Sequence, residues 1–201
     1  MLRCAITDRS KLAGDEVQKR ASLVDLARRW AAEGIELIQL REKDLGPLEL
    51  VEIAKSMVEA IALYPGTRLL VNNCLRAAVE SRAQGVHLPS NSVMLPDDIR
   101  RGYANHTLPS PLVTVSCHSF AEIQVARRNG ADAILFAPVF GKVIQGEEVT
   151  PATGLEELRA ACEAAAPIPV LALGGVTEEN TPLCLEAGAA GVAGIRLFQL
   201  L

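Results

Sequence analysis

The chain has 201 residues, enough for one large domain or two small ones, and 49% of them are hydrophobic, which excludes a globally disordered protein. Its 20 basic and 24 acidic side chains give a formal net charge of −4, which argues against a nucleic-acid partner because such proteins need a basic surface to displace phosphate counterions. The longest apolar runs, such as residues 168–173, are too short to cross a bilayer, so no membrane partner is expected.

The first half of the chain alternates short aliphatic runs with longer amphipathic stretches, a pattern that is typical of parallel βα units. Strands are predicted at residues 4–7, 35–41, 68–72 and 86–88. The helices that follow them are predicted from about 20 to 33, from 47 to about 63, from 75 to 84 and from 96 to 103.

The second half repeats the same alternation. Its predicted strands are residues 112–116, 133–136, 169–173 and 191–195. Helices are predicted at 120–129 and 155–165, and a third is expected to begin at Thr177, an N-cap residue followed by acidic side chains that suit the helix dipole. A polar loop at residues 141–148 follows the sixth strand and is either a lid over the site or a simple connector.

Eight successive βα units with no linker between them indicate one domain over residues 1–201, and they most simply close as an α/β TIM barrel. The alternative is an open doubly wound sheet, which usually has fewer strands. Residues 196–201 are too few for a normal helix, so a shortened eighth helix is expected. The partly uncovered seam between the first and last strands favours a homodimer.

The five cysteines include no C-x-x-C pair and are expected to be reduced thiols. The N-terminus has no long apolar segment of the kind that directs secretion, so a cytoplasmic protein is expected. His, Cys, Asp and Glu do not cluster at metal-ligand spacing, and no dinucleotide-binding or Walker motif is present. The residues therefore predict neither a metal nor a cofactor.

The end of the second predicted strand carries the first candidate site, because catalytic groups of a TIM barrel lie where its strands end. Alternation places Gln39, Arg41 and Lys43 on one face and Leu40 and Glu42 on the other. An amide, a guanidinium and an ammonium group on one face predict a site for phosphate or carboxylate. The alternative is a solvated strand end.

The second candidate site is the Gly174-Gly175 pair after the seventh strand. Adjacent glycines let backbone N–H groups approach a phosphate, and the loops after strands seven and eight form the usual phosphate site of this fold. Gly194 and Arg196, at the end of the eighth strand, are expected to join that site. The alternatives are a tight turn for the glycines and a surface position for Arg196.

The end of the fifth strand carries a candidate acid–base group. Ser116 and His118 share a face if the strand continues, whereas Cys117 points toward the helices. Histidine is the side chain best suited to proton transfer near neutral pH, although His118 could instead cap a helix or pack. His87 is interpreted as a hydrogen-bonded core residue, and Asn72 as a group that binds a ligand or forms a turn.

A set of short segments occurs in a fixed order along nearly the whole chain. They are AITD at 5–8, QLREK at 39–43, GVHL at 85–88, SCHS at 116–119, APVF at 137–140, IPVLALGG at 168–175 and GAAGVA at 188–193. In this order they resemble the thiamine phosphate synthase/TenI superfamily. The resemblance implies a TIM barrel and an enzyme of thiamine biosynthesis that binds a small phosphorylated thiazole.

The synthase branch of this superfamily joins a pyrimidine diphosphate to a thiazole phosphate and implies Mg²⁺ with two acidic ligands. Those two positions hold Asn73 and Ser92 here, and Gln145 stands where the synthase has a lysine. Neutral side chains supply no charge to hold a divalent cation. A synthase with an altered metal site, which would need Mg²⁺, is therefore an alternative hypothesis.

The TenI branch is the closer resemblance, because residues 87–92 read HLPSNS and His118 matches the functional histidine of that branch. It implies a metal-independent thiazole tautomerase, in which a histidine removes a proton from ring C2 and delivers one to an exocyclic carbon. The chain departs from the pattern at Arg196, where most members have serine. A non-catalytic protein that binds thiazole or thiamine phosphates is the third hypothesis.

Overall fold

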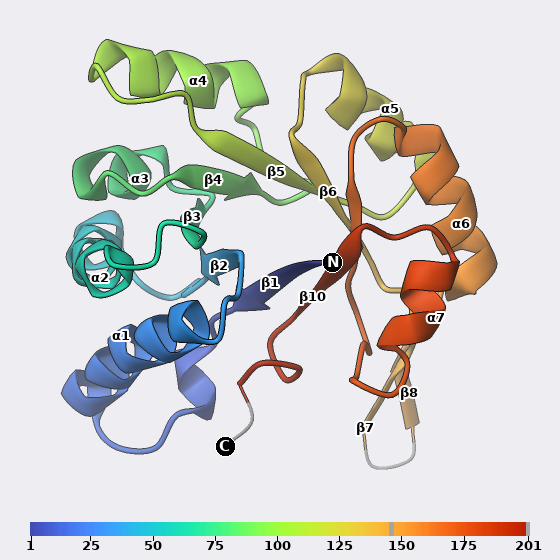
Figure 1. Ribbon diagram of the computed structural model, residues 1–201, viewed down its shortest axis with the longest axis horizontal. Coiled ribbons are helices and arrows are strands. Elements are labelled where there is room, and N and C mark those ends of the chain that lie inside the picture. The colour runs from blue at the N-terminus through green and yellow to red at the C-terminus, as the bar shows by residue number, and fades with distance from the viewer. Residues whose placement is uncertain (145–146, 200–201) are drawn as a thin grey trace.

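The computed structural model describes residues 1–144 and 147–199, and its main feature is a closed barrel of eight parallel strands (Figure 1). The barrel strands are β1 (Leu2–Ile6), β2 (Leu37–Leu40), β3 (Arg68–Asn72), β4 (Gly85–Leu88), β5 (Leu112–Cys117), β6 (Ala133–Phe136), β9 (Val170–Ala172) and β10 (Gly191–Gly194). Pairing of β10 with β1 closes the barrel. The predicted TIM barrel is therefore confirmed, and the open sheet is wrong.

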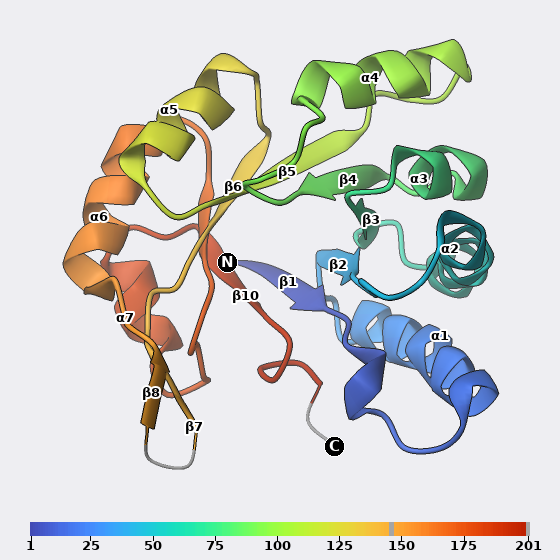
Figure 2. The ribbon, with the colours of Figure 1, turned by 180° about the vertical axis from the view of Figure 1, so that it is seen from behind.

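Helices connect successive strands and surround the barrel, as Figures 1 and 2 show from opposite sides. They are α1 (Glu16–Ala32), α2 (Pro47–Ile61), α3 (Leu75–Ser81), α4 (Pro96–Asn105), α5 (Phe120–Arg128), α6 (Gly154–Ala165) and α7 (Thr181–Glu186), with a short 3-10 helix, η1 (Arg9–Lys11), after β1. Within the described part of the chain, no helix has the length and apolar character needed to span a membrane.

Two helices begin at positions other than those expected. Helix α1 begins earlier, because Asp15 and Gln18 form a capping box in which each side chain accepts a hydrogen bond from the other residue's backbone N–H. Helix α7 begins later, so the prediction that Thr177 is its N-cap is wrong. The N-cap is Asn180, and Thr177 belongs to the preceding turn, where its carbonyl accepts a hydrogen bond from the backbone N–H of Thr181.

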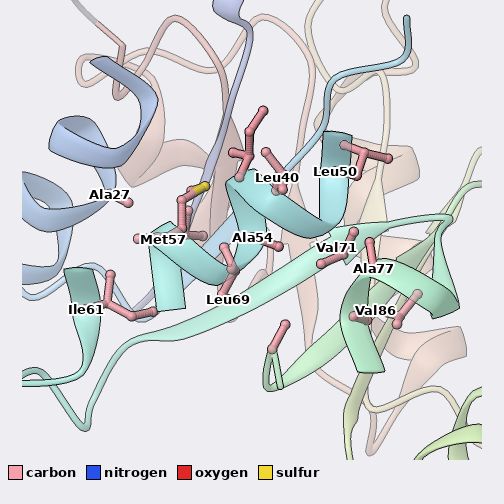
Figure 3. Packing of buried hydrophobic residues seen from close by; sticks show 14 of the residues in the cluster. Ala27, Leu40, Leu50, Ala54, Met57, Ile61, Leu69, Val71, Ala77 and Val86 are labelled. Carbon is pink, nitrogen blue, oxygen red and sulfur yellow. The ribbon is translucent and has the colours of Figure 1, made fainter. Parts of the chain in front are cut away.

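Apolar side chains on both faces of the strands hold the barrel together. Figure 3 shows the outer packing around α2, where Ala54 and Met57 lie in one buried cluster with Leu40 of β2 and Leu69 of β3. A separate cluster inside the barrel consists of Cys4, Ile6, Leu37, Ala133, Leu135, Leu171 and Ala193. Because side chains alternate along a strand, the same strands supply both clusters.

The segment after β6 contains a hairpin instead of the loop expected at residues 141–148. Strands β7 (Lys142–Ile144) and β8 (Glu147–Thr150) pair in antiparallel fashion outside the barrel (Figures 1 and 2). Residues 145–146, which include Gln145, lie outside the described residues. The function of this segment as a lid stays a prediction.

The described residues after β10 form a turn rather than an α-helix, and this turn lies between α1 and α7 (Figures 1 and 2). The backbone N–H groups of Phe198 and Gln199 donate to the Ile195 carbonyl. The Phe198 side chain packs against the buried clusters of both halves of the barrel, and its carbonyl accepts a hydrogen bond from Trp30 Nε1 at 3.0 Å. Gln199 is 5% exposed and makes two hydrogen bonds to the backbone of Asp8.

The seam between β1 and β10 is therefore covered, contrary to the open groove expected from the sequence. A single turn is sufficient because it places an aromatic ring and a buried amide in the space that a helix would otherwise fill. A homodimer stays a prediction, and the covered seam gives no support for it.

Replacing Gln199 with alanine is expected to destabilise the protein by about 1–3 kcal/mol, because the N–H and C=O groups of Asp8 both lose a partner in a partly buried place. Chemical denaturation measures the change in the free energy of unfolding. Gln84→Ala is the control, since Gln84 is exposed but also accepts a hydrogen bond from a backbone N–H. Equal losses in the two variants would contradict a closing role for Gln199.

Candidate active site

Two polar side chains meet inside the barrel at the ends of β2 and β3. Gln39 is 1% exposed, and its Nε2 donates a hydrogen bond to Asn72 Oδ1 at 3.0 Å. The structure thus brings together two of the residues that the sequence proposed for binding. Oε1 of Gln39 is buried and has no hydrogen-bond partner among the described residues. Such an orphaned acceptor costs free energy, so this atom is suited to accept a hydrogen bond from a ligand.

Arg41 and Lys43 line a cavity of about 290 Å³ beside the ends of β1 and β2. Leu40 is buried among the apolar residues on the helix side, as the alternation of faces predicts. Strand β2 ends at Leu40, and Glu42, which pairs with Arg9, lines the same cavity as Arg41 and Lys43. In the described part of the chain, neither Arg41 nor Lys43 forms an ion pair with a carboxylate. Their positive charges can therefore be used by a ligand anion.

A buried carboxylate joins the ends of β1 and β2 next to these two cations. The Glu42 side chain is 3% exposed and accepts hydrogen bonds from Thr7 Oγ1 at 2.6 Å and from Arg9 Nη1 at 3.2 Å. Thr7 Oγ1 accepts a hydrogen bond from the backbone N–H of Arg41 at 2.9 Å. The Arg9 guanidinium also binds Asp44 and lowers the pKa of that carboxyl group to about 2.

Sequence reasoning missed Thr7 and Arg9 as parts of this site. Thr7 is the last residue of the predicted first strand and Arg9 follows it, but the pattern along one strand does not show which side chains reach its neighbour. Glu42 was the signal that could have found them, because a carboxylate that is buried at the end of a barrel strand needs a partner.

His87 is buried inside the barrel with a hydroxyl group at each ring nitrogen. Its Nδ1 lies 2.8 Å from Thr114 Oγ1, and its Nε2 lies 2.9 Å from Ser116 Oγ. Burial, and secondly the positive charge of Arg41, lower the pKa of His87 to about 3. The ring is therefore neutral at physiological pH, in agreement with its interpretation as a hydrogen-bonded core residue. Ser116 therefore contacts His87, whereas His118 lies just beyond the end of β5, the strand that carries Ser116.

His118 is exposed at the end of β5, and the structure holds it in one tautomer. Its Nδ1 lies 2.7 Å from the carbonyl oxygen of Ala137, so Nδ1 carries the proton and donates it. Nε2 has no hydrogen-bond partner among the described residues and is the nitrogen that can take up a proton. The backbone N–H of His118 donates to the carboxylate of Glu122 in the first turn of α5. Cys117 is buried on the helix side, as predicted.

Gly174 and Gly175 follow β9 with positive φ angles of 94° and 66°. A Cβ atom on Gly174 would lie 2.7 Å from Pro138 Cα, and one on Gly175 would lie 2.7 Å from Phe140 Cβ. The pair therefore packs tightly against the segment after β6. This is the tight turn that the sequence offered as the alternative to phosphate binding. Phosphate binding by these glycines stays a prediction.

The end of β10 lies beside the end of β9, because the two strands pair in parallel. Gly194 is buried at this point, and Arg196 is exposed just beyond it. In the described residues, Arg196 has no ion-pair partner. The barrel end thus presents cations after β2 and after β10.

The two positions at which the resemblance implies acidic metal ligands are joined by a neutral hydrogen bond. Ser92 Oγ donates to Asn73 Oδ1 at 2.9 Å. Among the described residues, no group of three or more His, Cys, Asp and Glu side chains is placed to hold a metal ion. Because Mg²⁺ is held in proteins by charged carboxylates and phosphates, this pair of neutral side chains does not fit it.

A closed barrel with cations and paired glycines at the ends of its strands is the arrangement of TIM-barrel enzymes that act on phosphorylated substrates. The chain belongs to the family described as thiamine monophosphate synthase (TMP-TENI), whose model matches residues 4–198. The superfamily inferred from the sequence is therefore confirmed.

Several named relatives share about a third of their residues with this chain. The thiamine-phosphate synthase of Caldanaerobacter subterraneus is 34% identical over 194 residues, which cover 95% of this chain and 83% of that protein. The one from Syntrophomonas wolfei is 32% identical over 190 residues, covering 94% and 84%. A solved structure of thiamine phosphate pyrophosphorylase from Pyrococcus furiosus is 26% identical, with a TM-score of 0.78 and coverage of 97% and 85%. None of these names is specific to the TenI branch.

His87→Gln is expected to make the protein less sensitive to acid. In the unfolded chain this histidine takes up a proton near its ordinary pKa of 6.5, whereas the folded ring stays neutral down to about pH 3. The folded state therefore loses stability as the pH falls below 6.5, by about 2 kcal/mol from this residue at pH 5. Urea unfolding of wild type and variant at pH 7 and pH 5 measures the difference.

The control for this experiment is His106→Gln, which replaces an exposed histidine just after α4. We expect this variant to keep the difference in stability that the wild type shows between the two pH values. A His87→Gln variant that also kept the full wild-type difference would show that His87 is not held neutral in the folded state.

Proposed function

We propose that the protein is a thiazole tautomerase that acts on a thiazole phosphate carboxylate without a metal ion. A base removes the proton from ring C2, the double bonds shift, and an acid delivers a proton to the exocyclic carbon. Substrate and product have the same atoms and charge, so the reaction needs no oxidant, reductant or second substrate. Formation of the aromatic ring supplies the driving force.

One observation carries this proposal, namely the hydrogen bond that fixes the tautomer of His118. Donation of Nδ1–H to the Ala137 carbonyl leaves the lone pair of Nε2 as the proton acceptor. After Nε2 takes the C2 proton, the imidazolium keeps its hydrogen bond to the carbonyl and can return the proton to the exocyclic carbon. One histidine can therefore serve both steps, and His87, which stays neutral, is not needed as an acid.

The substrate carries a phosphate and a carboxylate, and the barrel end offers positive groups at two places. We assign the first anion to the groups at the ends of β2 and β3, together with Ser116 on β5. The groups at the two strand ends are Gln39, Arg41, Lys43 and Asn72. We assign the second to the groups after β9 and β10, which are Gly174, Gly175, Gly194 and Arg196. Two separated anion subsites would orient the ring between them, toward the end of β5.

A second candidate function is that of a thiamine phosphate synthase, which is what the named relatives are. The buried Oε1 of Gln39 favours it, because this acceptor needs an N–H or O–H donor from the ligand. A pyrimidine with an amino group has such a donor, whereas the thiazole phosphate carboxylate has none. The neutral Asn73–Ser92 pair argues against this candidate, because it does not supply the charge that Mg²⁺ requires.

His118→Ala is expected to lower the tautomerase rate by at least about 100-fold, because general acid–base catalysis by one side chain typically contributes that much. The reaction is followed by the ultraviolet absorbance of the aromatic thiazole. Activity should persist in EDTA. His106→Ala, which removes an exposed histidine outside the barrel, is the control and should keep the wild-type rate.

Three results would overturn the proposed function. They are a wild type that does not accelerate the tautomerisation, a His118→Ala variant that is fully active, and Mg²⁺-dependent formation of thiamine phosphate from a pyrimidine diphosphate and a thiazole phosphate. The third result would establish the synthase. Stabilisation by thiazole or thiamine phosphates with turnover of neither would instead indicate a binding protein.

Asn73→Asp combined with Ser92→Asp is expected to make stability depend on Mg²⁺. The interacting oxygens of the two wild-type side chains are 2.9 Å apart, so two carboxylates at these positions would repel each other and would attract a divalent cation. Thermal unfolding in EDTA and in Mg²⁺ measures the effect. Ser90→Asp with Asn91→Asp adds the same charge at exposed positions of the same loop and is the control.

Mg²⁺ could stabilise the wild type as much as it stabilises the Asn73→Asp, Ser92→Asp variant. That result would contradict our conclusion that the wild-type site does not fit the metal. Equal stabilisation of the Ser90→Asp, Asn91→Asp control would show that the effect is one of surface charge.

A further inference from the structure

The segment that carries Arg41 and Lys43 is anchored through Glu42, the residue between them. The Glu42 side chain is 3% exposed. Its carboxylate accepts hydrogen bonds from the Thr7 hydroxyl at 2.6 Å and from the backbone N–H of Arg9 at 3.1 and 3.2 Å. All of these bonds run from the end of β2 to the segment that follows β1. The two strand ends therefore cannot separate without breaking them.

Arg9 completes this anchor with its side chain, which is 9% exposed. Its Nη1 donates to Glu42 at 3.2 Å, and Nη1 and Nη2 bind the two oxygens of Asp44 at 2.6 and 2.7 Å. Glu42 and Asp44 are the residues on either side of Lys43, so one guanidinium holds the chain on both sides of this lysine. Arg41 is held directly, since its backbone N–H donates to the Thr7 hydroxyl.

We propose that Arg9 and Glu42 are positioning residues that hold Arg41 and Lys43 in place for an anionic group of the substrate. This role depends on the anion-binding function proposed above for Arg41 and Lys43. The charge of Arg9 is itself taken up by Glu42, Asp44 and a further carboxylate on α1, so Arg9 serves the anion through its neighbours. Fixed cations bind an anion more tightly than mobile ones because less conformational freedom is lost on binding.

The chain contains a matched ion pair that separates positioning from stabilisation. Glu36 accepts hydrogen bonds from the backbone N–H of Arg3 at 3.0 Å and from its Nε at 3.3 Å. This pair also joins the β1 and β2 segments, but at their amino ends, away from Arg41 and Lys43. If the carboxylates only stabilise the barrel, Glu36 and Glu42 should have the same effect on anion binding.

The test is the affinity for inorganic phosphate, measured by NMR titration in metal-free buffer at a temperature at which each variant is folded. We expect Glu42→Gln to weaken phosphate binding about tenfold, because a neutral amide cannot replace the charge-assisted bonds that hold the segment. Glu36→Gln should bind phosphate as the wild type does. Asp44→Asn removes an exposed partner of Arg9 and should also weaken phosphate binding. This variant replaces Glu42→Gln in the test if Glu42→Gln does not fold.

A double-mutant cycle with Arg41→Ala tests whether Glu42 acts through Arg41. In the Arg41→Ala background, Glu42→Gln should have a clearly smaller effect on phosphate affinity than it has in the wild type. Full additivity would overturn the inference, as would equal effects of Glu42→Gln and Glu36→Gln. A wild type that does not bind phosphate would overturn it as well.

Turnover provides a separate readout. In the tautomerase assay, Glu42→Gln should raise KM with little change in kcat, because His118 follows β5, at another part of the barrel end. Absence of tautomerase activity in the wild type would reject the proposed function and leave the phosphate titration as the test of positioning. Failure of the proposed function and failure of the positioning role are therefore distinguishable.

Discussion

Closure of the barrel by β1 and β10 is the constraint on which the whole site depends. The strands pair in parallel from Leu2 with Gly191 to Ala5 with Gly194. Their backbones approach so closely that a Cβ atom on Gly191 would lie 1.8 Å from the Leu2 carbonyl oxygen. Because the strands are parallel and the sheet has no edge, the carboxyl ends of all of them form one rim. The polar side chains of the candidate site come from distant parts of the chain and meet at this rim.

Charge along this rim offers partners to an anion, whereas among the described residues no group of three or more His, Cys, Asp and Glu side chains is placed to hold a metal ion. The buried carboxylate of Glu42 is neutralised by Arg9, which leaves the cations on either side of it without carboxylate partners. Burial keeps His87 neutral, and the Asn73–Ser92 hydrogen bond carries no charge. Each of these features follows from the high cost of leaving a charged or polar group unpaired in a protein interior.

The chain belongs to the thiamine monophosphate synthase family, whereas the tautomerase proposed for it belongs to the other branch of the superfamily. Relatives about a third identical to this chain are named as synthases, and the barrel is shared with the solved pyrophosphorylase. Gln39 argues against the proposed tautomerase in one respect, because its buried oxygen needs a donor that the proposed substrate does not supply.

By itself the sequence determined the fold class and the eight barrel strands, since aliphatic runs bounded by polar residues predict β3 and β6 with the same limits that they have in the structure. It also determined that Gln39 and Leu40 face opposite sides of β2, because that depends only on local backbone geometry. Only the tertiary structure decided that Glu42 pairs with Arg9, that His87 is neutral and that Phe198 covers the seam. These features depend on burial and on contacts between residues far apart in the chain, which no local pattern contains.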